Sequence, residues 1–302
     1  MPQPIPAPRA SGTTTSTALP LYWVTYGDPT NPTLVVLHGG PGADHRYLLP
    51  QMLHLAERYQ LVLYDQRGSG QSRAQTNAPI TWQDHVDDLA KLCTEFGVTN
   101  PSLVGYSWGG MLSMLYTVSA LDPAWKGATL PRPARLALIS PAPVTKAYRE
   151  QFDENLRRRG NAPVIVAERE ALMASDLRDS DPEAYRQRLF ELGVAGYFAD
   201  PANARHLTPF RVIGRVQQST WESLGDFDLL PLLPRIPQHQ IPAQIVHGRD
   251  DPIPAASSID AAHALACGIN LIERCGHVPF VERPAELWRA LDPFLASTDV
   301  IA

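Results

Sequence analysis

The sequence predicts an α/β protein whose mostly parallel sheet is flanked by helices and interrupted by a helical insertion. In the first half, short runs of β-branched and other apolar residues alternate with amphipathic stretches. In the middle, a charge-rich segment has helical periodicity and no strand pattern, and strand-like runs resume after it. The chain has 302 residues, 44% of them hydrophobic. At ~150 residues per domain, this length allows about two domains.

The first half contains four runs typical of buried strands and two helical stretches. The expected strands are 34–37, 61–64, 102–104 and 135–140, and the expected helices are 81–96 and 110–119. The first helix has apolar residues at helical spacing, and the second follows directly after a strand. This alternation is typical of a parallel sheet with crossover helices.

The second half predicts two inserted helices, at 164–177 and 182–194, then strands at 244–247 and 269–273 and a final helix at 285–295. Four prolines between residues 231 and 242 would stiffen the return to the sheet. We therefore expect a core domain formed by residues 21–141 and 231–302, with a helical cap at 142–230. Residues 1–20, which are rich in proline, are expected to form a flexible leader.

Charge and cysteine content exclude several function classes. The formal net charge is −5, which argues against nucleic acid or an anionic membrane as a partner. No apolar run approaches the ~18 residues that a membrane span needs. The three cysteines form no CxxC pair, so a disulfide framework or a thiolate zinc site is not expected. We expect a cytoplasmic protein that needs no metal or cofactor and acts on a small molecule or short peptide. The sequence does not predict its oligomeric state.

One motif between a predicted strand and a predicted helix carries a candidate nucleophile. The segment Gly105-Tyr106-Ser107-Trp108-Gly109 has the G-x-S-x-G form of a nucleophile elbow. The turn is so tight that the residues two before and two after the serine must be small. It lifts the hydroxyl of Ser107 clear of the backbone and directs the first N–H groups of the helix at an incoming carbonyl.

A serine hydroxyl needs a base to take its proton, and His277 is the best candidate among the nine histidines. It follows the last predicted strand, at the edge where parallel sheets build their sites. His38 and His247 also adjoin strand ends, but we expect them to hold loops by hydrogen bonding. The other six histidines have no such context.

The base needs an acid to orient it, and hydrolases with this elbow have the chain order serine, acid, histidine. Asp250 and Asp251 both follow the strand before His277. Neighbouring residues at a strand exit point in different directions, so only one of them can reach the imidazole. The residues alone leave this choice open.

A glycine-rich segment, His38-Gly39-Gly40-Pro41-Gly42, follows the first predicted strand. Glycines let the backbone approach a substrate closely, so an N–H of this loop can form an oxyanion hole together with the N–H of Trp108. A phosphate-binding loop is the alternative. It is disfavoured because Pro41 lacks an N–H donor and the chain has neither GxGxxG nor a Walker lysine.

Four motifs in order resemble those of the proline iminopeptidase family of α/β-hydrolases. They are HGGPG at 38–42, DQRGSGQS at 65–72, GYSWGG at 105–110 and HGRDD at 247–251. The resemblance covers about 21–140 and 240–298. It implies an α/β-hydrolase fold with a helical cap after the sixth strand.

The resemblance also implies roles for individual residues. The family's acid ends a Gly-Arg-x-Asp segment, which corresponds to Asp251. By the same mapping Ser107 is the nucleophile and His277 the base, while Gly40 and Trp108 supply the oxyanion donors. In the DQRGSGQS segment we expect Asp65 and Arg67 to brace loops near the site.

The implied activity is hydrolysis that releases an N-terminal proline or a similar small residue from short peptides. An aminopeptidase must bind an α-ammonium group, for which carboxylates are needed. The family's Ala-Arg-x-Glu-Asn stretch is absent, and Glu191 and Glu222 are the nearest candidates, although both could be solvated helix residues. Hydrolysis of a small neutral ester or lactone is the alternative. A non-catalytic small-molecule-binding protein of the same fold is a third, remote one.

Overall fold

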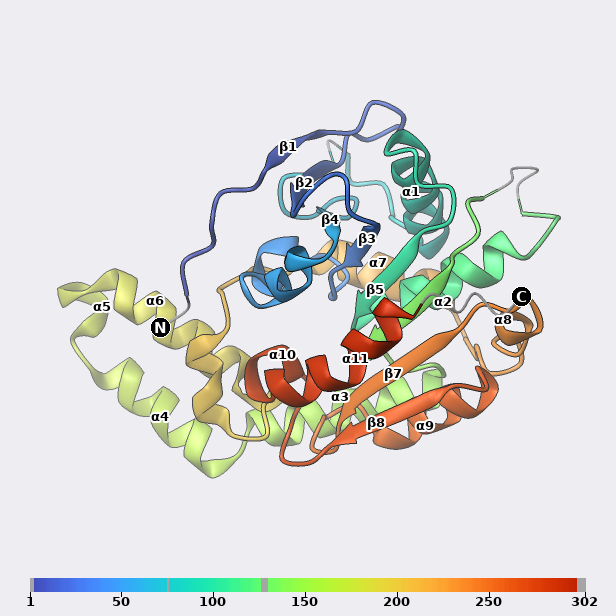
Figure 1. Cartoon of the computed structure of the whole chain (residues 1–302). Coiled ribbons are helices and arrows are strands. Elements are labelled where there is room, and N and C mark those ends of the chain that lie inside the picture. The colour runs from blue at the N-terminus through green and yellow to red at the C-terminus, as the bar shows by residue number, and fades with distance from the viewer. Residues whose placement is uncertain (1–2, 75, 126–129, 298–302) are drawn as a thin grey trace.

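A computed structural model describes residues 3–74, 76–125 and 130–297 (Figure 1). Its centre is an eight-stranded sheet with the order β1-β2-β4-β3-β5-β6-β7-β8. The strands are β1 (Ala10–Thr13), β2 (Tyr22–Tyr26), β3 (Thr33–Leu37), β4 (Gln60–Tyr64), β5 (Ser102–Tyr106), β6 (Arg135–Ile139), β7 (Ala243–Gly248) and β8 (Gly268–Ile272). The pairs β1–β2 and β2–β4 are antiparallel, and the other pairs are parallel. The predicted α/β class with a mostly parallel sheet is therefore confirmed.

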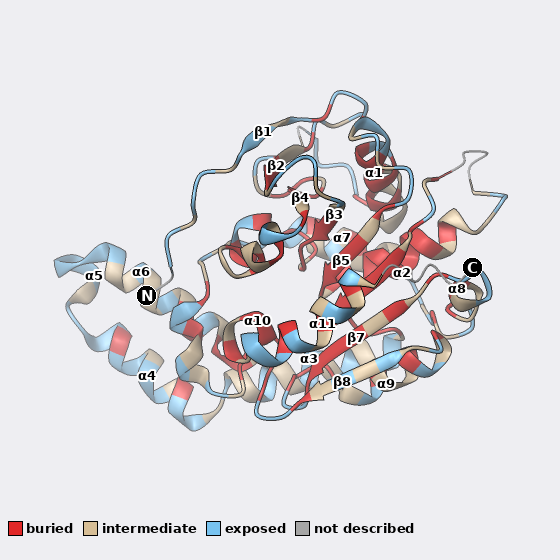
Figure 2. Cartoon of the chain, viewed as in Figure 1, coloured by how far each residue is buried: buried red, intermediate tan, exposed pale blue. Residues whose placement is uncertain are grey.

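Helices cover both faces of the sheet, and successive strand residues alternate between two apolar cores. The first core contains Val35 and Leu103 together with helices α1 (Trp82–Glu95), α2 (Trp108–Ala120) and α9 (Ala255–Ala264). The second contains Val36 and Val104 together with α11 (Pro284–Ala296) and the 3₁₀-helices η1 (His45–Leu48) and η2 (Gln51–Glu57). Because both faces are covered, the central strands are buried along most of their length, as Figure 2 shows.

Eight helical segments lie between β6 and β7, and we call the first seven of them the inserted helices. They are α3 (Lys146–Gly160), α4 (Pro163–Ala174), α5 (Leu177–Ser180), α6 (Pro182–Val194), η3 (Ala195–Tyr197), η4 (Pro201–His206) and α7 (Gly214–Leu224). Figure 1 shows α4, α5 and α6 projecting away from the sheet. A small cluster around Ile165, Leu172 and Leu192 holds α4 against α6, and α6 also packs on the second core through Phe190 and Val194. Sequence periodicity predicted α4 and α6 but not α3 or α7.

The structure differs from the flexible leader that the sequence predicts over residues 1–20. Within that range, β1 pairs with β2 at the edge of the sheet. The turn after β1 is held by the carboxylate of Glu95 at the end of α1, which accepts the N–H groups of Thr15 and Ser16 at 2.9–3.0 Å. Such side-chain contacts over long sequence separation are not visible in local composition.

The topology brings the predicted site segments to one edge of the sheet. Strands β3, β5, β7 and β8 run in the same direction, and their carboxyl ends lead into the HGGPG loop, Ser107, Asp251 and the loop containing His277. The chain also has two short helices. Helix α8 (Arg235–Gln238) follows the inserted helices, and α10 (Pro279–Glu282) follows the loop that contains His277. Among the described residues, no helix combines the length and apolarity needed to cross a bilayer.

Candidate active site

The turn between β5 and α2 holds Ser107 in a conformation that side-chain-bearing residues rarely adopt. Its φ is 53° and its ψ is −119°. A Cβ at position 105 would lie 2.4 Å from the carbonyl oxygen of Gly109, and one at position 109 would lie 2.2 Å from that of Leu37. Both glycines of the G-x-S-x-G motif are therefore required by crowding, as the elbow predicts.

Ser107, His277 and Asp251 form a continuous chain of hydrogen bonds across three loops. The Oγ of Ser107 lies 2.9 Å from Nε2 of His277, and Nδ1 of the same ring lies 2.8 Å from Oδ2 of Asp251. An ionised carboxylate can only accept, so the ring proton belongs on Nδ1 and Nε2 is free to accept from the serine hydroxyl. The arrangement can therefore take a proton from Ser107.

The structure distinguishes between the two adjacent aspartates. The side chain of Asp251 is fully buried, whereas Asp250 is exposed to solvent. Asp251 also accepts the N–H of Ile253 through Oδ1 at 2.7 Å. Burial alone would raise the pKa of Asp251, but the neighbouring imidazoles of His277 and His247 and this backbone donor together hold it below its usual value. The carboxylate is therefore stabilised in its ionised form.

The two rival histidines hold loops, as the sequence predicts. His38 receives the N–H of Gln66 on Nε2 at 3.0 Å and faces the carbonyl of Gly39 through Nδ1. His247 makes hydrogen bonds with the carbonyl of Ile253 and the hydroxyl of Ser258. Burial lowers the pKa of both imidazoles.

The HGGPG loop lies directly against the nucleophile. A Cβ at Gly39 would lie 2.9 Å from Cβ of Ser107, and Gly40 has a φ of +120° that favours glycine. Among the described residues, no acceptor receives the N–H of Gly40 or that of Trp108. Within the described residues, both donors are therefore left without a protein acceptor.

Tyr47 is a residue of this site that the sequence did not reveal. Its hydroxyl accepts the N–H of Gly39 at 2.6 Å and so fixes the loop that carries Gly40. The ring is buried, and burial raises the pKa of its hydroxyl. No sequence pattern distinguishes Tyr47 from the other nine tyrosines, because its contact depends on the placement of η1.

The DQRGSGQS segment braces loops beside the site, as expected. Asp65 accepts the N–H of His45 at 3.0 Å and that of Gln71 at 2.8 Å. Arg67 makes two hydrogen bonds with Asp88 of α1, at 2.5 and 2.8 Å. In the described part of the chain, neither Asp65 nor Arg67 has a hydrogen bond with the three residues of the Ser–His–Asp chain.

Aromatic side chains surround the imidazole of His277. The ring centroids of Tyr106, Tyr197 and Phe152 lie 5.1, 5.4 and 6.5 Å from it. Tyr197 and Phe152 belong to the inserted helices, which therefore supply part of the wall of the site. No sequence signal pointed to either residue, because aromatic residues are also common in ordinary helix contacts.

The two carboxylates considered for ammonium binding are engaged elsewhere. Glu191 accepts from Arg188 at 2.8 Å and from Gln187 at 3.0 Å. Glu222 is exposed, accepts from Gln218, and lines a cavity of about 190 Å³ beside residues 77–80. Among the residues that the structure describes, neither has a hydrogen bond with Ser107 or His277.

Asp153 is the acidic residue of α3 that lies near the aromatic wall, and it is paired. Both of its carboxylate oxygens accept from Nε of Arg149 at 2.9 Å. The guanidinium of Arg149 in turn stacks on the rings of Trp221 and Phe152, 4.1 and 5.5 Å from their centroids. A carboxylate already neutralised by a guanidinium is a poor receptor for an ammonium group.

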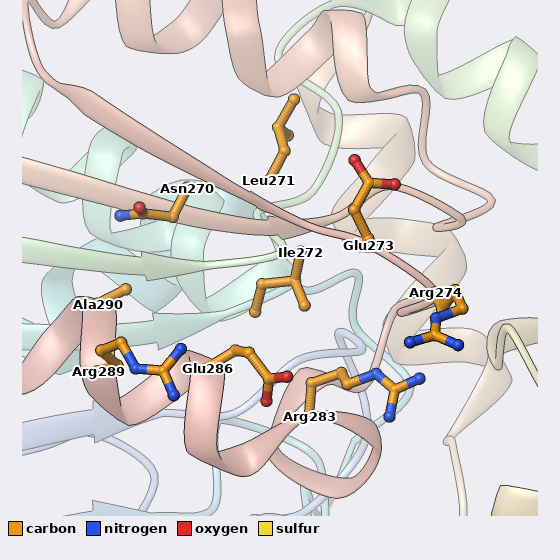
Figure 3. A pocket seen from close by; sticks show the side chains of 9 residues that line it. All are labelled: Asn270, Leu271, Ile272, Glu273, Arg274, Arg283, Glu286, Arg289 and Ala290. Carbon is orange, nitrogen blue, oxygen red and sulfur yellow. The ribbon is translucent and has the colours of Figure 1, made fainter.

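A cavity of about 410 Å³ lies apart from the Ser–His–Asp chain, along the edge strand β8 and the start of α11 (Figure 3). It is lined by Asn270, Leu271, Ile272, Glu273, Arg274, Arg283, Glu286, Arg289 and Ala290. None of the five predicted site residues is among them. Within the parts of the chain that the structure describes, no three His, Cys, Asp or Glu side chains are grouped as a metal site.

Comparisons with known proteins agree with this geometry at the level of the family. A model of the alpha/beta hydrolase fold matches residues 32–284. A proline iminopeptidase of Lactobacillus delbrueckii subsp. lactis is 26% identical over 297 residues, covering 92% of this chain and 96% of its own. The expected resemblance to proline iminopeptidases is confirmed.

Several solved structures match nearly the whole chain. A membrane phospholipase A matches with a TM-score of 0.65 and 28% identity, over 95% of this chain and 85% of its own. A proline iminopeptidase-related protein from Thermus thermophilus matches with a TM-score of 0.70 and 20% identity, over 95% and 97%. The protein is a hydrolase, and the chain belongs to the alpha/beta hydrolase fold family.

Proposed function

We propose that the protein is a serine hydrolase in which Ser107, His277 and Asp251 act as a catalytic triad. The observation that carries this proposal is the unbroken chain of hydrogen bonds from Oγ of Ser107 through the imidazole to a buried carboxylate. The strained turn at Ser107 and the two available N–H donors beside it support the same assignment.

The proposed reaction is acyl transfer in two steps. His277 takes the proton of Ser107 through Nε2 while Oγ attacks the substrate carbonyl. The N–H groups of Gly40 and Trp108 stabilise the resulting oxyanion, and each such donor is typically worth roughly 10²- to 10³-fold in rate. The protonated imidazole gives its proton to the leaving group, and water then hydrolyses the acyl-enzyme with His277 again as the base.

The geometry favours a small carboxylic ester or lactone as the substrate. The rings of Tyr106, Tyr197 and Phe152 enclose the imidazole, which suits an apolar acyl or alcohol group. An α-ammonium group would need a free carboxylate, whereas Asp153 and Glu191 are already paired with arginines.

Release of an N-terminal proline from short peptides is the second candidate. It is favoured by the similarity to proline iminopeptidases, which extends over 92% of the chain. Both activities use the same acyl-enzyme chemistry and differ in how the substrate's amine or alkyl part is bound.

Turnover of proline-β-naphthylamide and of p-nitrophenyl butyrate by the purified protein separates the candidates, with Ser107→Ala as the control. We expect Ser107-dependent turnover of the ester with little turnover of the amide. Efficient release of proline would establish the peptidase instead. If neither compound is hydrolysed and Ser107 does not react with a fluorophosphonate, the chain is a binding protein of the same fold.

A further inference from the structure

The loop that carries His277 is joined to the inserted helices by their backbones. The N–H of His277 donates to the carbonyl of Tyr197 at 2.7 Å. The two segments are so close that a Cβ at Gly276 would lie 2.3 Å from the same carbonyl oxygen and 2.7 Å from the nitrogen of Ala199. A side chain at position 276 would therefore force the segments apart.

Glu282, in α10, bridges the same two segments with its carboxylate. Oε2 accepts the N–H of Gly276 at 2.6 Å, and Oε1 accepts the N–H of Ala199 at 2.8 Å. One oxygen therefore holds the residue before the candidate base, and the other holds the inserted segment that carries Tyr197. Glu282 is only 8% exposed, so its hydrogen bonds are shielded from water.

Backbone donors and a guanidinium face the carboxylate of Glu282. Burial raises the pKa of Glu282 above its usual value, and the backbone donors and the nearby guanidinium of Arg159 offset only part of that rise. Arg159, from α3, donates to the carbonyl of Phe198 at 2.5 Å and to the carbonyl of Asp250. The inserted helices are thus attached to the loops of both the base and the acid.

We propose that Glu282 is a positioning residue for His277. It fixes the loop of His277 so that the imidazole stays beside Oγ of Ser107 and the ring of Tyr197. This proposal rests on the proposed function, since it assumes that His277 is the base. Without the bridge, the base loop keeps the backbone bonds from His277 to Tyr197 and from Asp250 to Cys275, and Nε2 is less tightly held in line with Oγ of Ser107. A displacement of the base by about 1 Å is enough to cost about 10²-fold in rate.

The bridge also defines which part of the insertion is fixed. Residues 197–200 move with the catalytic base because they share Glu282 with it. Of the inserted helices, α6 also packs on the second core through Phe190 and Val194, whereas α4 and α5 pack in the small cluster around Ile165. The bridge therefore attaches Tyr197 to the loop of His277.

The variant Glu282→Gln tests the bridge, and Glu286→Gln is the matched control. The amide keeps the size of the carboxylate and one acceptor, but its NH₂ group must face a backbone N–H. Glu286 is exposed four residues further along and, within the described residues, has no hydrogen bond with the base loop. We expect kcat of Glu282→Gln to fall about 10- to 100-fold with KM within about twofold. Glu286→Gln should keep the kcat of the unmodified protein.

A second readout does not depend on turnover. The Nδ1 proton of His277, which lies in the hydrogen bond to Asp251, gives a downfield proton resonance that reports how well the ring is held. We expect Glu282→Gln to broaden this resonance or speed its exchange with water while circular dichroism stays unchanged. Glu282→Asp keeps both acceptors on a shorter arm and should give an intermediate loss of kcat.

The proposal is overturned if folded Glu282→Gln retains the kcat and the proton resonance of Glu286→Gln. If Glu282→Gln does not fold, the same result in folded Glu282→Asp overturns it. Failure of the proposed function would look different. In that case the unmodified protein would show no Ser107-dependent turnover, yet the resonance would still show whether Glu282 holds the ring.

Discussion

Replacing Asp251 by asparagine removes the charge of the candidate acid and, through one backbone contact, also reverses the hydrogen bond to the base. Oδ1 of Asp251 accepts the N–H of Ile253 at 2.7 Å, so the amide oxygen of the introduced asparagine must occupy that position. The NH₂ group then takes the place of Oδ2, which lies 2.8 Å from Nδ1 of His277. Facing a donor, Nδ1 must accept, and the ring proton moves to Nε2, where it blocks proton transfer from Ser107.

We expect Asp251→Asn to lower kcat by about 10⁴-fold, equivalent to about 5 kcal/mol of transition-state stabilisation. KM should stay nearly constant because the buried carboxylate does not face the substrate. The assay is steady-state hydrolysis of p-nitrophenyl butyrate, with Asp250→Asn as the matched control because that side chain is exposed. Near-normal kcat in Asp251→Asn, together with a large loss in Asp250→Asn, would refute the assignment of the acid.

Three further predictions concern the site and the folded state. Ser107→Ala and His277→Ala should each abolish nearly all turnover, and the double variant should have a kcat no lower than that of either single variant. If the losses in kcat are additive instead, the two residues do not act together in one step. Tyr47→Phe removes the acceptor of the Gly39 N–H and should lower kcat by about 10-fold, with an unchanged kcat excluding a role for this contact. Burial lowers the pKa of His85 from 6.5 to about 3, so the folded state holds the ring neutral and loses stability as the pH falls below 6.5. Urea unfolding at pH 7 and pH 5 should show a loss of about 2 kcal/mol from this residue, absent in His85→Gln; equal losses in both proteins would show that His85 does not titrate in this way.

The sheet and the nucleophile turn could be predicted from the sequence because their signals are local. Buried parallel strands have short apolar runs, and the glycines at 105 and 109 are forced by the turn around Ser107. The predicted helices at 164–177 and 182–194 correspond to α4 and α6 for the same reason. The domain boundaries at 141–142 and 230–231 stay predictions.

Other features depend on contacts between residues that are distant in sequence. Local pattern could not separate Asp250 from Asp251, whereas the folded chain brings only Asp251 to an imidazole 26 residues away. Glu282 reaches Ala199, which is 83 residues earlier, and Tyr47 reaches Gly39 through the placement of η1. Residues 10–13 form an edge strand rather than part of a flexible leader because β2 lies beside them.

The substrate class was also open for a physical reason. Whether a carboxylate can bind an ammonium group depends on the cations around it and on where its helix lies relative to the site. Arg188 and Glu191 are three residues apart on α6, and Arg149 and Asp153 are four apart on α3, so both pairs are local to their helices. Only the folded chain places the guanidinium of Arg149 against Trp221 and Phe152. Because these two carboxylates are already paired with arginines, we propose an ester rather than a peptide as the substrate.

The central claim, that Ser107 is the nucleophile of an acyl-enzyme, is tested most directly by mass spectrometry after reaction with a fluorophosphonate. We predict one adduct per chain, located on the peptide that contains Ser107, with no adduct in Ser107→Ala or in protein unfolded before the reaction. An intact mass that stays unchanged under these conditions, or an adduct on a different residue, would contradict the account.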